Sequence, residues 1–188
     1  MEIRIDKNQL SGVRKMLLEL RGQFPRAFSR ALNKTVTGTR TDLVGLVRRD
    51  YNYKAAAIRK RIALNKATFQ HLSASVKSSG GGVHLTDIAG TRQTKTGVSV
   101  NVKKATGRRL ISRAFIREAR NSGKTIVFRR QEIGGKMVPR LPLGARYASH
   151  PEVIYNTPEN WPRIQKQAGE RLDKNFDHEV DTVLRGIA

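Results

Sequence analysis

Two long helical patterns, one near each end of the chain, constrain its fold most. Apolar side chains recur every three or four positions along both stretches, which is the spacing of one helix face. In the first stretch the stripe consists of Phe24, Phe28, Ala31, Leu32, Val36, Thr39, Leu43, Leu46 and Val47. In the second it consists of Trp161, Ile164, Ala168, Leu172, Phe176, Val180, Val183 and Leu184. Each helix must bury its stripe against another layer of secondary structure.

Local signals mark the ends of these helices and predict shorter elements around them. Pro25 suits a first helical turn, Gly186 is an end signal, and Gly38 favours a bend near residues 35–41. Two further helices are predicted over 9–21 and 54–62, and a strand over 2–6.

The region between the two stripes has strand character. Alternation or β-branched content predicts strands over 69–76, 97–102 and 125–128, with an edge element at 84–88. Gly134-Gly135 predicts a hairpin leading to 137–138, whereas 110–119 gives mixed signals. The predicted fold is α+β: a small, mainly antiparallel sheet packed against the long N-terminal helices and the C-terminal helix, with a Pro-rich arm.

We expect a single domain over 1–188. Its parts are a helical basic part (1–66), a β-rich part (67–138), a Pro-rich loop or arm (139–158) and the C-terminal helix (159–187). Five of the six prolines fall within 139–162, so this stretch is expected to be an ordered loop or one that orders on assembly.

Positive charge dominates most of the chain. Lys and Arg number 37 against 15 Asp and Glu, for a net charge of +22. Residues 1–66 carry +11 and 67–150 carry +13, whereas 151–188 carry −2. Such an excess makes a folded chain repel itself, so it indicates a polyanionic partner. In a ring of identical subunits the opposite charges of the two regions could meet across an interface.

Residue patterns for catalysis or cofactor binding are missing from the sequence. The four histidines (His71, His84, His150 and His178) are not at metal-ligand spacings, there is no cysteine, and no P-loop motif occurs. Residues 67–150 hold only three acidic side chains, too few for the converging carboxylates of a two-metal nuclease. We therefore expect no enzyme activity, metal or cofactor.

No membrane segment is predicted either. No stretch approaches the roughly 18 apolar residues of a membrane span, and the first ten residues lack the apolar core of a signal peptide. We expect a protein that is not secreted by that route and has no membrane partner.

Basic side chains cluster in pairs and triplets, without the interleaved aromatic residues of a single-strand binder. Any nucleic acid bound is therefore expected to be duplex, held through its phosphates without sequence preference. The short basic helix at 54–62 lacks the second element that would frame a helix-turn-helix. The residues predicted to face DNA or a partner are Arg48, Arg49, Arg59, Lys60, Arg61, Lys103, Lys104, Arg108, Arg109, Arg129 and Arg130.

The order of several short motifs resembles a known family. RALNKT at 30–35 is followed by TRT at 39–41, VRRDY at 47–51 and KAAAIRKR at 54–61. The strand at 97–104, the AFI element at 114–116, VFRR at 127–130 and RLPL at 140–143 come next. Over residues 27–147 this arrangement is similar to the minor tail protein Z family of long-tailed bacteriophages and prophages, also called tail completion proteins.

The resemblance implies a structural virion protein at the head-proximal end of the tail, assembled in the host cytoplasm. It implies a tail terminator that forms part of the neck or head–tail joining region and helps position DNA in the tail channel. By analogy, the partners are further copies in a homohexameric ring, other tail tube or neck proteins, and viral double-stranded DNA in the lumen.

Two other functions are compatible with the residues. A free, non-sequence-specific duplex-DNA-binding protein would bind DNA in isolation, with an affinity that falls steeply with salt. A nuclease or other processing enzyme would need a site assembled from distant segments, and metal-dependent cleavage would reveal it.

Overall fold

The computed structural model describes residues 2–6, 23–120, 122–130, 132–133, 136–137 and 143–185. The chain separates into two compact units. Unit 1 comprises residues 1–45, 59–79 and 152–188, and unit 2 comprises 46–58 and 80–151. These boundaries cut across the four parts expected from the sequence.

Two long helices form one layer of unit 1. Helix α2 spans Phe24–Asp50 and α5 spans Asn160–Arg185, preceded by the short α4, Glu152–Tyr155. Their apolar stripes face each other, and the ring of Phe176 packs edge-on against Phe24 and Phe28, with ring centroids 5.5 and 5.7 Å apart. Both long helices predicted from the sequence are therefore confirmed.

Polar contacts also join α2 to α5. Buried Glu179 accepts hydrogen bonds from Lys34 Nζ at 2.5 Å and forms an ion pair with Arg30 Nε at 2.8 Å. Farther along, Arg171 Nη2 donates to Asp42 Oδ2 at 2.6 Å. The helix α2 is assigned as one continuous element through residues 35–41, where a bend was predicted.

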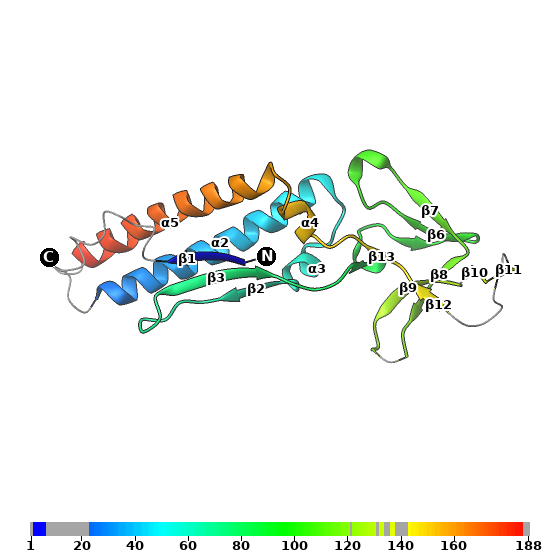
Figure 1. Cartoon of the computed structure of the whole chain (residues 1–188), viewed down its shortest axis with the longest axis horizontal. Coiled ribbons are helices and arrows are strands. Elements are labelled where there is room, and N and C mark those ends of the chain that lie inside the picture. Colours follow the sequence, from blue (N-terminus) through cyan, green and yellow to red (C-terminus); the bar gives the residue numbers. More distant parts are fainter. Residues whose placement is uncertain are drawn as a thin grey trace. The chain divides into compact units, whose positions relative to one another are not determined.

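A three-stranded antiparallel sheet forms the second layer of unit 1, and Figure 1 shows its strand β1 passing across α2. Its order is β1 (Glu2–Asp6), β3 (Ser73–Ser78) and β2 (Ile62–Asn65). Ile3 lies opposite Val76, and Leu64 lies opposite Val76 from the other side. The sheet buries Ile62, Ala74 and Val76.

Small antiparallel sheets build unit 2. One has the order β5 (Arg92–Gln93), β6 (Gly97–Val100), β7 (Arg109–Ser112); another has β12 (Leu143–Ala145), β9 (Thr125–Arg130), β8 (Ala114–Glu118). Two-stranded pairs join β13 (Tyr147–Ala148) to β4 (Val83–His84) and β10 (Glu132–Ile133) to β11 (Lys136–Met137). Two 3-10 turns complete it: η2, Leu85–Asp87, and η3, Lys104–Thr106.

The α+β class is therefore confirmed, but the strands form several small sheets where one was predicted. The β10–β11 pairing fits the predicted hairpin, whose glycines lie outside the described residues, as do the predicted helix 9–21 and the end signal Gly186. Residues 139–162, expected as a loop or arm, contain β12, β13 and α4 where the structure describes them.

Three local predictions were wrong. The helix expected over 54–62 is only the short α3, Ala55–Arg59, because Ile62 starts strand β2 instead. The strand expected over 69–76 is β3, which starts at Ser73, and Phe69 is 62% exposed. Leu184, placed in the buried stripe of the last helix, is 47% exposed.

Candidate nucleic-acid interface

The end of α2 and the η3 turn bring four predicted cations together in unit 2. Tyr51 forms a β-bridge with Lys103, and the Asn52 backbone N–H donates to Val102 O at 2.9 Å. These contacts set Lys103 and Lys104 beside Arg48 and Arg49, more than 50 positions earlier in the sequence. We call Arg48, Arg49, Lys103 and Lys104 the basic corner.

Some charges of the basic corner also serve the fold. Lys104 Nζ donates to Arg48 O at 2.7 Å, so a cation caps the negative end of the helix dipole of α2. Lys103 Nζ lies over the ring of Tyr51, 5.7 Å from its centroid. The hydrogen bond from Arg49 holds the pKa of Asp50 below its ordinary value, with a smaller contribution from the charge of Lys104. Asp50 therefore stays ionised and offsets part of the positive charge.

The next predicted pair, Arg108 and Arg109, is exposed, and Arg109 begins strand β7. Arg108 Nη1 donates to Gly90 O at 2.9 Å, which fastens one loop of unit 2 to another. Arg109 lies opposite Val100 in the ladder and leaves its side chain in solvent.

The remaining predicted cations differ in exposure. Arg59 ends α3 and Lys60 follows it, and both are exposed, whereas Arg61 is half-buried. On β9, Arg130 is exposed and Arg129 is half-buried, because successive side chains of a strand point to opposite faces. Within the described part of the chain, no hydrogen bond or ion pair engages the side chains of Arg48, Arg59, Lys60, Arg109 and Arg130.

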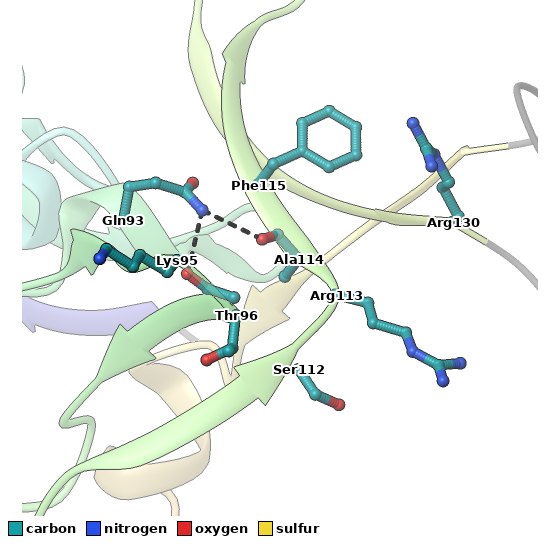
Figure 2. A pocket seen from close by; sticks show the side chains of 9 residues that line it. Gln93, Lys95, Thr96, Ser112, Arg113, Ala114, Phe115 and Arg130 are labelled. Carbon is teal, nitrogen blue, oxygen red and sulfur yellow. Dashed lines mark hydrogen bonds between the residues drawn. The ribbon is translucent and has the colours of Figure 1, made fainter.

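Sequence reasoning missed a basic hollow beside β8, shown in Figure 2. Its volume is about 780 Å³, and the described residues that line it include Lys95, Arg113 and Arg130 but no acidic side chain. Gln93 forms one wall. Its Nε2 donates hydrogen bonds to Gly97 O and, at 3.3 Å, to Ala114 O. Its Oε1 accepts a hydrogen bond from the Ile116 backbone N–H. Lys95 and Arg113 stand alone in the sequence, so no cluster signalled them.

The corner between β7 and β8 is conformationally unusual. Arg113 has φ of 60°, a left-handed backbone conformation that costs a non-glycine residue roughly 1–2 kcal/mol. Its backbone N–H donates to Thr96 O at 2.9 Å, which holds the corner in place. This corner turns the chain from one small sheet into the next.

The described residues also bear on metal binding, on the titration of buried groups and on membrane spanning. Among the described residues, no three His, Asp or Glu side chains converge closely enough to hold a metal ion. Burial raises the pKa of the Tyr155 hydroxyl, so that group stays protonated. No helix in the described ranges combines the length and apolar character needed to cross a bilayer.

Comparison with models of known protein families gave a match over nearly the whole chain. The family model described as Prophage minor tail protein Z matches residues 11–188, nearly the whole chain. Comparisons with curated proteins and with solved structures gave no significant match.

Proposed function

Since the chain belongs to the prophage minor tail protein Z family, we propose that it completes the head-proximal end of a phage tail. Family membership makes it a structural protein of the tail, and hence of the virion, that contacts other tail components. The finer position is our proposal. In it, copies of the chain form a closed, homohexameric ring at the neck, and DNA passes through the lumen.

The charge of unit 2 is the observation that supports this proposal. Unit 2 carries 18 Lys and Arg but only four Asp and Glu. The basic corner and Arg109 belong to this excess, and Arg48 and Arg109 are exposed with no side-chain partner in the described chain. A surface rich in exposed cations suits the phosphates of passing duplex DNA, which it attracts without reading the bases.

A closed ring is the simplest way to use such a surface. Identical subunits related by rotation present the same cations around a central axis, and closure limits growth. The family match supports a tail assembly, and the ring stoichiometry follows by analogy with other tail components.

Charge reversal in assembled particles tests the proposal. Arg48→Glu with Arg109→Glu should leave the fold intact, because both side chains are solvent-exposed. We expect particles of this variant to retain tails but to join DNA-filled heads poorly, because like charges would then face the phosphates. Infectivity should fall at least roughly tenfold below that of the wild type. The matched control is Arg26→Glu with Lys66→Glu, which changes the net charge equally in unit 1.

Wild-type infectivity of the Arg48/Arg109 variant would reject the DNA-facing assignment. The purified protein distinguishes the alternatives. A free DNA-binding protein would bind duplex DNA tightly as a monomer, with a steep salt dependence. A processing enzyme would cut DNA when Mg²⁺ is added. We expect neither from the isolated chain.

A further inference from the structure

One face of the β12-β9-β8 sheet carries an aromatic pair between arginines. Phe115 lies opposite Phe128 in the register, and their ring centroids are 6.1 Å apart. Both rings are partly exposed. Because alternate residues of a strand share a face, Arg117 and Arg130 lie on this face too, one beyond each end of the pair. We call these four residues the aromatic face.

The aromatic face is unpartnered within the described chain. Arg117 and Arg130 are exposed, and no hydrogen bond or ion pair holds their side chains there. Val127, on the opposite face of the same strand, is fully buried, and on the side of the aromatic face Ile126, level with Arg117, is buried as well. The aromatic face borders the hollow of Figure 2, which Phe115 and Arg130 help to line.

The last helix presents a surface of opposite character. Asp173, Asp177 and Asp181 are exposed and spaced four residues apart, so they form one row along α5. Leu184 continues the row and is 47% exposed. Like charges at this spacing destabilise a helix, and no ion pair within the described chain offsets them. We call these four residues the acidic row.

The two surfaces match in length as well as in charge. Four strand positions separate the ladder levels of Arg130 and Arg117, about 13 Å at 3.3 Å per residue. The row from Asp173 to Leu184 is about 16 Å long at 1.5 Å per residue. Each surface combines charged groups with an apolar one: two arginines with the phenylalanine pair, and three aspartates with Leu184.

We propose that the aromatic face binds the acidic row of a second copy of this chain. The contact is head-to-tail, because it joins different surfaces of the two copies, and repetition of such a contact generates a ring or a filament. This contact rests on the proposed function in one respect, namely that several copies of the chain assemble together. It names the two surfaces through which the copies would bind each other.

A second copy fits the aromatic face better than DNA does. Partly exposed aromatic rings with flanking arginines are typical of the centre of protein interfaces. The phosphates of duplex DNA would bind the two arginines, but the phenylalanine rings would then lie against the charged sugar-phosphate backbone. Duplex DNA would therefore be drawn to the basic corner, whose four members are all cations.

Reciprocal charge reversal in the purified full-length chain tests this contact. One variant is Arg117→Glu with Arg130→Glu, and the other is Asp173→Lys with Asp177→Lys. Self-association is measured by analytical ultracentrifugation at 0.15 M salt. Each variant alone should associate at least about tenfold more weakly than the wild type, because like charges would then face each other.

An equal mixture of the two variants should recover association. In the mixture the reversed face meets the reversed row, and the unchanged face meets the unchanged row, so every contact is again complementary. The control Arg26→Glu with Lys66→Glu should associate like the wild type. Circular dichroism should show that all variants are folded, since every substituted side chain is exposed.

Three results would overturn the proposal: a wild-type chain that stays monomeric at all concentrations, variants that associate normally, or variants that fail to recover when mixed. Loss of duplex-DNA binding by the Arg117/Arg130 variant, with self-association unchanged, would also overturn it and assign the face to DNA. The experiment uses no phage particles, so its outcome is independent of where in the tail the protein lies.

Discussion

Two buried tyrosines differ in one hydrogen bond. The Tyr53 hydroxyl donates to Ser149 O at 2.8 Å, whereas the Tyr155 hydroxyl is buried and has no hydrogen-bond partner in the described chain. Both side chains are 2% exposed or less. A buried polar group without a partner has lost its bonds to water without compensation, so the same substitution should act differently at the two positions.

We predict that Tyr53→Phe lowers the free energy of unfolding by about 1 kcal/mol, because the Ser149 carbonyl loses its donor. Tyr155→Phe should leave that free energy unchanged or raise it slightly, since the removed hydroxyl bonds to nothing there. Urea unfolding followed by circular dichroism measures both. Equal losses for the two variants would contradict the difference in bonding.

Glu179 is buried, whereas the two cations that bind it are not. Its side chain is 5% exposed, whereas the side chains of Arg30 and Lys34 that bind it are about half exposed. Replacing both cations by Met leaves a buried charge unpaired, and we expect a loss of about 3 kcal/mol of stability. Glu179→Gln should cost less, about 1–2 kcal/mol, because the two cations can turn to solvent.

The same urea titrations decide this prediction. Lys166→Met is the control, because its ion pair with Glu170 is exposed, at 3.9 Å, and worth little. A loss for the double Met variant no larger than that for Glu179→Gln would show that burial of the carboxylate does not set the cost.

At the scale of elements, α2 packs closely on α5 at one glycine. A Cβ built on Gly38 would lie 2.7 Å from Cδ of Arg171, whose side chain crosses over this residue to reach Asp42. Gly45, in the same helix, and Gly169, in α5, have open space around them. The glycine that weakens the sequence pattern of α2 thus makes room for the ion pair between the helices.

We predict that Gly45→Ala raises the free energy of unfolding by about 0.5–1 kcal/mol, as expected for an alanine in a helix. Gly38→Ala should show none of this gain, because Arg171 must move and release Asp42. Thermal and urea unfolding of the two variants measure the difference. An equal gain at both positions would mean that Arg171 adapts without loss.

The sequence predicted elements best where one periodic signal ran for many residues. The stripes of α2 and α5 recur over more than five turns each, so both helices could be predicted from the sequence. Strand β2 was missed because its four residues follow an alanine-rich helical run, and they become a strand only by pairing with β3. Leu184 fits the helical period, but it lies at the end of α5 and stays exposed.

At the scale of the whole molecule, the sequence gives the net charge. It does not tell which charged side chains lie next to one another in the fold. The basic residues were identified by type, and their role at a DNA surface stays a prediction. Only the fold shows that Lys104 reaches the Arg48 carbonyl or that Phe115 lies beside Phe128. Contacts of this kind join residues far apart in the chain, and no local pattern encodes them.

The most direct test of the proposed function is the position of this protein in the phage particle. Cryo-electron microscopy of particles that carry the chain fused to a small rigid domain should show extra density, compared with unfused particles. We predict a closed ring of this density where the tail meets the head. Extra density at the distal tip, along the tail tube, or nowhere in the particle would contradict the account.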